Sequence, residues 1–266
     1  MKYVFGVDIG GTTVKIGLFD VEGNVLDKWE IPTRTENDGE EILPDVADSI
    51  REKMKQMDKD AIAGVGVGAP GPIDAGGVVH RAVNLGWKTF NVKETLEALI
   101  NLPVRAGNDA NVAALGEMWM GGGKGYKDLV VVTLGTGVGG GIIVDGRMIS
   151  GSTGAAGEIG HIHVDDTETD VCNCGNKGCL EQFASATGIT RLANKKLAST
   201  DMDSVLRGGE VSAKTVFDAV KARDPLAMEV AEQFGKYLGD ALAAVAGVVN
   251  PEAFVIGGGV SKAGEV

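Results

Sequence analysis

The chain of 266 residues is long enough for two lobes of a globular protein, and its 44% apolar and 23% charged residues are ordinary for one. Its net charge of −12 argues against a nucleic-acid or membrane-surface binder. No apolar run could cross a bilayer, and no signal peptide is visible. The three cysteines all fall within Cys172–Cys179 and cannot form a disulfide framework, so we expect a cytoplasmic protein.

Apolar patterns in the first half of the chain predict alternating strands and helices, which is typical of an α/β fold. The expected strands are Tyr3–Ile9, Val14–Phe19, Val25–Ile31, Ala63–Gly68 and Val104–Gly107. The expected helices are an apolar stripe from Ile42 to Met54, and the segments Val92–Ile100 and Ala110–Trp119. A loop rich in glycine and proline follows the fourth strand at Ala69–Gly77.

The second half repeats the pattern of strand, glycine turn and strand with which the chain begins. We expect a strand at Leu129–Leu134, a glycine turn at Gly135–Gly141 and a returning strand at Ile142–Val144. A shift of 125 residues lays Asp8–Asp20 over Thr133–Asp145. Such an internal duplication predicts two lobes facing each other across a cleft. We place the small lobe at residues 1–107 and the large lobe at residues 108–266.

The longest predicted helix is Pro225–Val249. Asp224 can cap it, proline suits its first position, and one apolar stripe runs along its length. A strand at Phe254–Ile256 follows and runs directly into Gly257-Gly258-Gly259. This is the third predicted strand that is followed directly by glycines, after Tyr3–Ile9 and Leu129–Leu134.

Two of the glycine turns are candidates for binding phosphate. In Asp8-Ile9-Gly10-Gly11-Thr12-Thr13 the backbone N–H groups can approach phosphate oxygens, and Asp8 can hold Mg²⁺ through water. Taken alone, this segment also fits a simple hairpin turn. Within Leu134–Gly141, the seven positions from Gly135 onward include five glycines. So many glycines weaken a strand by removing side-chain packing, and close approach of a ligand would explain that cost. We therefore expect the second turn to bind phosphate.

Asn108-Asp109-Ala110-Asn111 follows a short strand and opens a helix. Asp109 could be a helix cap, which is the simpler interpretation of the local pattern. However, the carboxyl ends of strands in α/β proteins are also where functional side chains gather. Phosphoryl transfer to a hydroxyl needs a carboxylate that orients and deprotonates it. Asp109 is the best candidate for that role.

The segment Cys172–Cys179 is the most specific local signal. Three thiolates within eight residues lack only a fourth ligand for tetrahedral zinc. His161 lies upstream and is the first candidate for the fourth ligand, and His163 is the second. Three free cysteines in a reduced loop are the alternative. His80 is expected to be a surface histidine.

With these motifs the chain resembles the ROK family (repressors, open reading frames, kinases) and, within it, the bacterial glucokinases. The stretch Cys172-x-Cys174-Gly175-x-x-Gly178-Cys179-x-Glu181 is close to diagnostic, whereas the glycine hairpins are shared with the wider actin-like ATPases. The motifs that carry the resemblance follow in the family's order: Asp8–Thr13, Asn84–Trp87, Asn108-Asp109, Leu134–Gly141, Glu158–His161, Cys172–Glu181 and Val255–Ser261.

The resemblance implies a duplicated actin-like (ribonuclease H-like) α/β fold, with ATP and Mg²⁺ between two lobes and Asp109 as general base. The side chains that would bind the other sugar hydroxyls are Asn84, Asn108, Glu158, His161 and Glu181. ATP would be bound at Gly10, Gly11, Thr12, Thr13, Gly135, Thr136, Gly137, Gly139, Gly257 and Gly258, and Mg²⁺ at Asp8. Structural zinc would be held by His161, Cys172, Cys174 and Cys179. It would fix His161, whose other ring nitrogen faces the sugar.

The activity that the resemblance implies is ATP-dependent phosphorylation of glucose to glucose 6-phosphate by a cytoplasmic homodimer, with neither nucleic acid nor membrane as partner. N-acetylmannosamine, N-acetylglucosamine and fructose are alternative acceptors, because pocket shape rather than fold selects the sugar. A non-catalytic, sugar-binding regulator is the alternative from another class. Family regulators carry a DNA-binding helix-turn-helix ahead of the first strand, and here that strand begins at Tyr3, which favours the enzyme.

The end of the chain departs from the family pattern. Relatives continue with helices that complete the nucleotide pocket and pack back onto the first lobe. We therefore expect apolar surface without cover on that lobe, weak ATP binding, and lower stability than in a longer chain. Ser261–Val266 is expected to open a helix, with Ser261 as its cap.

Overall fold

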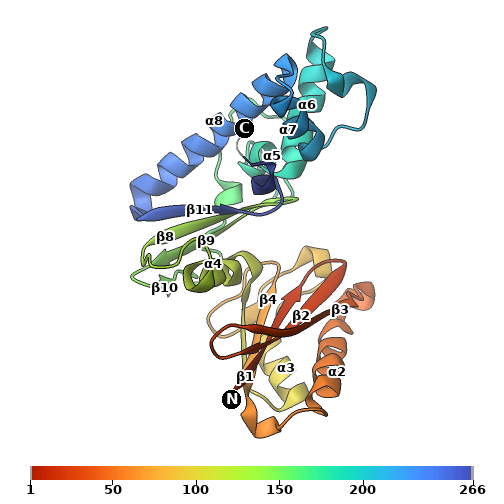
Figure 1. The fold of residues 1–266 in the computed structure, drawn as a ribbon, viewed down its shortest axis with the longest axis vertical. Coiled ribbons are helices and arrows are strands. Elements are labelled where there is room, and N and C mark those ends of the chain that lie inside the picture. The colour runs from red at the N-terminus through yellow and green to blue at the C-terminus, as the bar shows by residue number, and fades with distance from the viewer. Residues whose placement is uncertain (1, 265–266) are drawn as a thin grey trace. The chain divides into compact units, whose positions relative to one another are not determined.

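The computed structural model describes residues 2–264, and its contacts divide the chain into two compact units (Figure 1). Unit 1 comprises Met1–Gly121 and Met148–Ala156, and unit 2 comprises Gly122–Arg147 and Gly157–Val266. Each unit has its own hydrophobic core. The division lies later than the predicted boundary at residue 107, because the helix that follows this residue packs on strands of unit 1.

Unit 1 is built on a five-stranded mixed sheet with the strand order β3-β2-β1-β4-β7. Its strands are β1 (Tyr3–Ile9), β2 (Thr13–Asp20), β3 (Val25–Pro32), β4 (Ile62–Ala69) and β7 (Val104–Asn108). β1 pairs antiparallel with β2 and parallel with β4, which in turn pairs parallel with β7. The sequence predicts all five strands.

Two helices cover one face of this sheet. α2 (Ile42–Met54) and α3 (Val92–Ile100) have the predicted bounds and share one apolar core with the strands. Phe5, Val7 and Ile9 of β1 are buried in that core. Because side chains alternate along a strand, Asp8 projects from the opposite face. The sheet therefore carries its apolar layer on one side and the first candidate carboxylate on the other.

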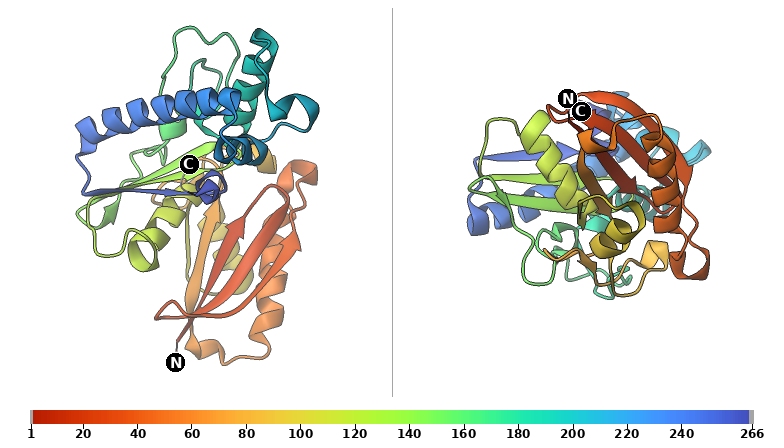
Figure 2. Two further views of the ribbon diagram at one scale, coloured as in Figure 1. Left: turned by 45° about the horizontal axis from the view of Figure 1, so that its top comes forward. Right: turned by 90° about the horizontal axis from the view of Figure 1, so that it is seen from below.

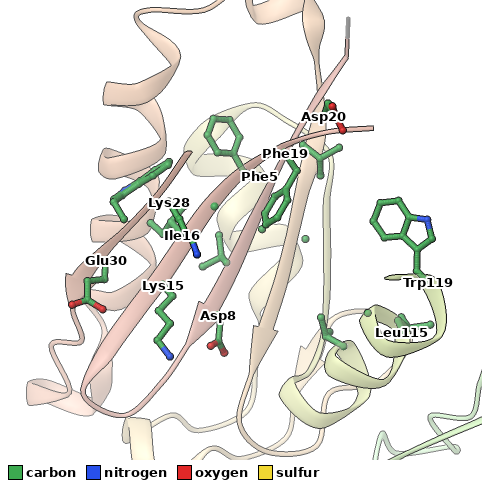
Figure 3. Close-up of a pocket in the computed structure, with 18 of the residues that line it drawn as sticks. Phe5, Asp8, Lys15, Ile16, Phe19, Asp20, Lys28, Glu30, Leu115 and Trp119 are labelled. Atoms are coloured by element: carbon green, nitrogen blue, oxygen red, sulfur yellow. The ribbon is translucent and has the colours of Figure 1, made fainter. Parts of the chain in front are cut away.

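The face of the sheet that carries Asp8 has an open groove (Figure 3). The groove has a volume of about 930 Å³ and is lined by this face and by α4 (Asp109–Met120). Two of its apolar side chains on α4, Leu115 and Trp119, are 40% and 53% exposed. The groove is therefore an exposed, largely apolar surface of unit 1.

Unit 2 is built on a sheet with the order β10-β9-β8-β11. Its strands are β8 (Leu129–Leu134), β9 (Val138–Val144), β10 (Arg147–Met148) and β11 (Ala253–Gly257), and its helices are α5 (Glu181–Ala184), α6 (Ala186–Ser199), α7 (Ala213–Lys221) and α8 (Pro225–Val249). α8 runs along one face of the sheet (Figures 1 and 2) and shares a core with β8. The sequence predicts α8 with the observed bounds and Asp224 as its cap, but none of the other three helices.

Short elements connect the larger ones. In unit 1 they are α1 (Glu36–Gly39), β5 (Val78–Val79), β6 (Phe90–Asn91) and the 3₁₀ helices η1 (Lys59–Ala61) and η2 (Val83–Leu85). In unit 2 they are the 3₁₀ helices η3 (Ile159–His161), η4 (Val205–Gly208) and η5 (Val260–Ala263). No helix within residues 2–264 is both long and apolar enough to span a membrane.

The prediction that Ser261 caps a helix is wrong. Ser261 lies inside η5, whose N-cap is Gly259. The Ser261 hydroxyl donates instead to the Gly258 carbonyl at 2.9 Å, which closes the turn after β11. The last two residues of the predicted helix start, Glu265 and Val266, lie outside the described part of the chain.

The two sheets share their connectivity. β1 is antiparallel to β2 and parallel to β4, and β8 is antiparallel to β9 and parallel to β11. A glycine-containing turn joins the antiparallel pair in both units. This correspondence confirms the predicted repeat of strand, glycine turn and strand, and with it the α/β architecture.

The second glycine turn is shorter than predicted. β9 begins at Val138, so that the segment Gly139–Gly141 pairs with β8 instead of lying in the turn. Glycine is required at position 140 because a Cβ atom there would come within 2.6 Å of the Ile159 side chain. Part of the glycine density therefore serves the close packing of η3 on β9 rather than ligand approach.

Candidate functional site

Asn108 and Asp109 lie where β7 ends and α4 begins. Asn108 is the N-cap: its side-chain oxygen accepts from the Asn111 N–H at 3.1 Å. Its side-chain amide also donates to the Gly71 carbonyl at 3.1 Å, so this buried residue is held within the protein at both ends of its side chain. Asp109 is the first helical residue and not the cap. The simpler interpretation of the sequence assigned capping to the wrong residue of the pair.

Two features of its surroundings act on the Asp109 carboxylate, the N-terminus of α4 and the protein atoms that partly shield it from water. Its Oδ1 accepts from the Ala110 N–H at 2.7 Å, and a helix N-terminus favours negative charge. The side chain keeps access to solvent, yet the protein around the carboxyl group raises its pKa above the ordinary aspartate value. The charge of Asp8 raises this pKa further. A more basic carboxylate is a better proton acceptor near neutral pH.

The first glycine turn is fixed by Thr33, the residue that follows β3, and its tip is exposed. The Gly10 N–H donates to the Thr13 carbonyl at 3.0 Å, which closes the turn. Thr33 clamps it from the side, because its hydroxyl donates to the Gly10 carbonyl at 2.7 Å and its N–H to the Thr12 carbonyl at 3.0 Å. Gly11 and Thr12 are exposed at the tip. A held turn with an accessible backbone is suited to receiving an anion.

Asn84, a predicted sugar ligand, lies in η2 next to this turn. Its side chain is exposed, and a Cβ atom built at Gly11 would be 3.9 Å from the Asn84 Cβ atom. Within unit 1 the structure thus brings Asn84 to Gly11, and Asp109 within electrostatic reach of Asp8. His80, in contrast, is exposed and lies 3.5 Å from Asp74, as expected for a surface histidine.

In unit 2 the glycine turn after β8 is held by the start of α6. The Gly135 N–H donates to the Gly137 carbonyl at 3.0 Å. The Ala186 N–H donates to the Gly135 carbonyl at 2.8 Å, and the Thr187 hydroxyl to the Thr136 carbonyl at 2.7 Å. The turn therefore lies at the N-terminus of a 14-residue helix, where anions are favoured. Ala186 and Thr187 are not among the predicted site residues, although Ser185, the cap of α6, is a local signal for the helix start.

The glycines after β11 lie at the same sheet edge as this turn. β11 pairs parallel with β8, with Gly257 opposite Thr133, so both strands end together. Gly258 has φ of +93° and packs on the Leu134 backbone so closely that a Cβ atom would overlap it. Two predicted nucleotide-binding segments of unit 2 are therefore neighbours.

His161 and the three cysteines form a compact cluster. Their candidate ligand atoms all lie within 4.8 Å of one another, with His161 Nδ1 3.7 Å from Cys172 Sγ and Cys174 Sγ 3.6 Å from Cys179 Sγ. Zinc–sulfur bonds of about 2.3 Å in a tetrahedron place sulfur atoms roughly 3.8 Å apart, which is close to the 3.6 Å between Cys174 Sγ and Cys179 Sγ.

The remaining candidate ligand, His163, does not join the cluster. Its Nδ1 lies 2.9 Å from the Lys177 carbonyl and its Nε2 lies 2.8 Å from Asp166, so both ring nitrogens are engaged elsewhere.

Burial raises the pKa of the Cys172 and Cys179 thiols. Without a cation these thiols keep their protons, and Cys172 donates to Glu181 Oε1 at 3.0 Å. A bound metal ion would replace those protons.

The two predicted acidic sugar ligands of unit 2 flank His161. Glu158 Oε2 lies 4.0 Å from His161 Nε2, and Glu181 Oε1 lies 3.8 Å from His161 Nδ1. The Nδ1 side of the ring thus faces Cys172, and the Nε2 side faces Glu158. Glu181 also reaches the glycine turn, because a Cβ atom at Gly137 would be 2.8 Å from its Oε2.

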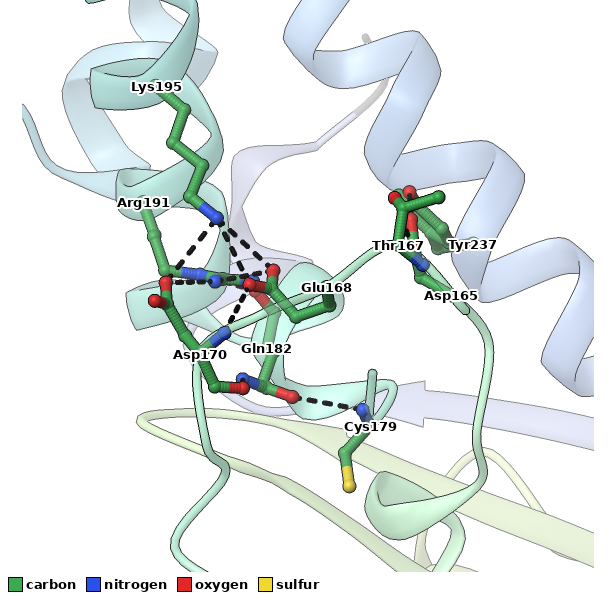
Figure 4. A network of polar contacts seen from close by, with 9 residues as sticks. All are labelled: Asp165, Thr167, Glu168, Asp170, Cys179, Gln182, Arg191, Lys195 and Tyr237. Atoms are coloured by element: carbon green, nitrogen blue, oxygen red, sulfur yellow. Dashed lines mark hydrogen bonds and ion pairs between the residues drawn. The ribbon is translucent and has the colours of Figure 1, made fainter. Parts of the chain in front are cut away.

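A polar network that sequence reasoning missed adjoins Cys179 (Figure 4). It consists of Glu168, Asp170, Gln182, Arg191 and Lys195. Arg191 and Lys195 are four residues apart on α6 and both meet the buried Glu168. That helical spacing of basic residues was the available signal, but nothing local indicates which carboxylate it meets.

Comparisons with known proteins agree with this geometry. The model of the ROK family matches residues 4–266. A glucokinase of Halalkalibacterium halodurans is 45% identical, with 99% of this chain and 82% of that protein aligned. A glucokinase of Thermotoga maritima is 37% identical, with 99% and 84% aligned. The solved structure of a ROK family glucokinase from Streptomyces griseus, in complex with glucose and AMPPNP, superposes with a TM-score of 0.80 at 35% identity, covering 99% of this chain and 85% of that one.

These relatives have the duplicated actin-like, ribonuclease H-like fold, and the paired hairpin sheets of units 1 and 2 are its two halves here. The family match covers all motifs from Asp8 to Ser261. The chain belongs to the ROK family.

Proposed function

We propose that this protein is a glucokinase that transfers the γ-phosphoryl group of ATP to the terminal hydroxyl of glucose. The observation that carries the proposal is the 45% identity to a glucokinase over 99% of the chain, together with the complete set of site motifs in the fold. The reaction breaks the bond between the γ-phosphorus and its bridging oxygen, forms a bond from phosphorus to the sugar oxygen, and releases ADP.

Asp109 is the proposed general base. Its carboxylate accepts the proton of the attacking hydroxyl, so that the oxygen gains electron density as it reaches phosphorus. The raised pKa of Asp109 supports this role, because it makes the carboxylate a stronger proton acceptor. Asn108, capping α4, fixes the backbone from which Asp109 projects.

The other polar side chains are proposed to orient the sugar. Asn84, Glu158, His161 and Glu181 would hydrogen-bond its hydroxyl groups. Asn108 is the weakest member of the predicted set, since its side chain already bonds Asn111 and Gly71. Free hydroxyls suit carboxylate and imidazole partners, and a replaced hydroxyl would leave these groups unpaired beneath the bound sugar.

ATP is proposed to bind at the glycine segments, where the absence of side chains lets phosphate approach the backbone closely. These are Gly10, Gly11, Thr12 and Thr13 in unit 1, and Gly135, Thr136, Gly137, Gly139, Gly257 and Gly258 in unit 2. The exposed tip of the first turn and the α6 N-terminus at the second support phosphate contacts there. Mg²⁺ would neutralise phosphate charge when bound, and Asp8 is the residue proposed to hold it through water.

Zinc is proposed to be a structural ion of unit 2. His161, Cys172, Cys174 and Cys179 offer the donor set and spacing of a closed tetrahedral site. Zinc there would lock the imidazole of His161 in one orientation and hold the loop that carries Glu181. Reduced cysteines of this kind fit a cytoplasmic protein, and the homodimer stays a prediction that light scattering would test.

The test of the proposed function is a coupled assay of ADP release across a panel of sugars. We expect glucose to give the highest kcat/KM, above N-acetylmannosamine, N-acetylglucosamine and fructose. A higher kcat/KM for N-acetylmannosamine would assign the protein to that substrate instead. Sugar binding by calorimetry without ADP release for any sugar would identify a non-catalytic regulator.

A further inference from the structure

The side chain of Gln182 spans the base of the cysteine loop. Its Oε1 accepts from the Cys179 N–H at 3.0 Å, and its Nε2 donates to the Asp170 carbonyl at 3.0 Å (Figure 4). Cys179 closes the loop, and Asp170 comes two residues before Cys172, which opens it. A single side chain thus fastens both ends of the segment that carries the cysteines.

Arg191 holds the backbone of Gln182 in turn. From α6, its Nε and Nη2 donate to the Gln182 carbonyl at 3.2 and 2.8 Å. Its Nη1 meets Glu168 at 2.6 Å and Asp170 at 3.0 Å, and its guanidinium lies over the Phe183 ring at 5.1 Å. This multiple bonding uses the planar fork of arginine, which lysine could not reproduce.

The Arg191 contact is anchored on a buried charge. The Glu168 side chain is only 3% exposed and is paired with Arg191 and Lys195. A buried carboxylate loses much free energy when it is left unpaired, so this pairing holds the guanidinium in one place. The position of the Gln182 backbone is therefore set by a contact that resists displacement.

Gln182 is also the neighbour in sequence of Glu181. The Glu181 carboxylate lies 3.0 Å from Cys172 Sγ and 3.8 Å from His161 Nδ1. It therefore contacts two members of the cluster, one of which, Cys172, is at the start of the loop. A shift of the backbone at residue 182 would move Glu181 directly and Cys179 through the side-chain hydrogen bond. Displacements of about 1 Å at such positions can cost up to roughly 10²-fold in rate.

We propose that Gln182, held by Arg191, is a positioning residue that fixes the cysteine cluster and Glu181 relative to each other. The effect on Glu181 rests on the proposed function, because it matters only if Glu181 binds the sugar. The effect on the cysteines does not depend on the substrate. A residue of merely structural importance would lower stability without a selective effect on the cluster or on sugar.

The experiment uses the zinc-loaded protein with Gln182→Met, which keeps the side-chain length and removes both hydrogen bonds, and with Arg191→Met. Arg207→Met is the matched control, because the Arg207 guanidinium also donates to three backbone carbonyls of unit 2, those of Leu197, Thr200 and Met202, near the other end of α6. Zinc release to a chromogenic chelator is measured below the melting temperature of each variant, and KM is measured separately for glucose and for ATP.

We expect Gln182→Met and Arg191→Met to release zinc about tenfold faster than the wild type and to raise KM for glucose about tenfold, with KM for ATP unchanged. Arg207→Met should change neither. The proposal is overturned if Gln182→Met releases zinc no faster than Arg207→Met, or if KM for glucose and ATP rise together. Should Arg191→Met not fold, Gln182→Met decides alone. A wild-type protein that phosphorylates no sugar would refute the proposed function. Zinc release would still test whether Gln182 and Arg191, the side-chain clasp of the cysteine loop, hold the cluster.

Discussion

The two units position their candidate functional side chains by different physical means. In unit 1, Asp8 and Asp109 come from regular elements, at the end of β1 and at the first residue of α4. In unit 2, Glu158, His161 and Glu181 lie in short elements and loops between β9 and α6. Strand pairing and helix hydrogen bonds fix the first set. In the second set, side-chain contacts among the cysteines, Gln182 and Arg191 add to a few backbone hydrogen bonds of loops and short helices.

This difference teaches where each unit is vulnerable. Backbone hydrogen bonds in a sheet or helix survive a single side-chain change, so a substitution at Asp109 should affect chemistry and little else. A loop held by thiols and a side-chain clasp depends on each of its few contacts. Metal removal and loop substitutions should therefore disturb the geometry of unit 2 while leaving that of unit 1 intact. The following predictions test this contrast, beginning with the largest effect.

Asp109→Asn should lower kcat by about 10²- to 10⁴-fold, because it removes the proton acceptor and keeps the shape of the side chain. Glucose affinity, measured by calorimetry, should change little. Asp45→Asn is the matched control, since Asp45 also lies in the first turn of a unit 1 helix but pairs with Arg34. Near-normal turnover of Asp109→Asn would show that the base is another residue.

Cys172→Ser should remove zinc, which elemental analysis should otherwise find at about one ion per chain. We expect KM for glucose to rise about 10- to 100-fold, together with a lower melting temperature, because His161 and Glu181 lose their anchor. His163→Gln provides the control, since His163 lies outside the cluster and should leave the zinc content unchanged. A zinc-free wild-type protein with full activity would contradict this prediction.

Gly137→Ala should reduce kcat/KM for glucose by less than about tenfold, since the added methyl group would lie 2.8 Å from Glu181 Oε2 and displace a flexible carboxylate. Gly239→Ala in α8 is the control, because no atom lies within 4 Å of a Cβ there. The control should keep full activity and gain slight stability, as alanine favours a helix over glycine. Equal activity of both variants would show that the contact between Glu181 and the glycine turn after β8 does not matter for catalysis.

The smallest expected effect is a shift in pH dependence. A general base works only when deprotonated, so activity should be present above the pKa of Asp109 and lost as the pH falls through it. Burial and the Asp8 charge raise that pKa, so the acid limb of kcat/KM should lie above the value of an ordinary aspartate. Asp8→Asn should move the limb to lower pH, whatever it does to the maximal rate. An unmoved limb would assign the titration to another group.

The sequence by itself determined the elements whose signals are local. Apolar periodicity and the caps Asp224 and Pro225 predicted α8, alternating apolar runs predicted the strands, and the repeated hairpin predicted the duplicated architecture. The cysteine spacing and His161 predicted the cluster, because ligands close in sequence need little from the rest of the fold.

Only the tertiary structure decided the contacts between segments distant in sequence. It paired Gly140 with Val132 of β8 and packed Ile159 of η3 against it. It also paired Arg191 with Glu168 and with the Gln182 carbonyl. Periodicity and caps report how a segment satisfies its own backbone, whereas these choices depend on which distant atom comes within bonding distance. That distance is set only when the chain has folded.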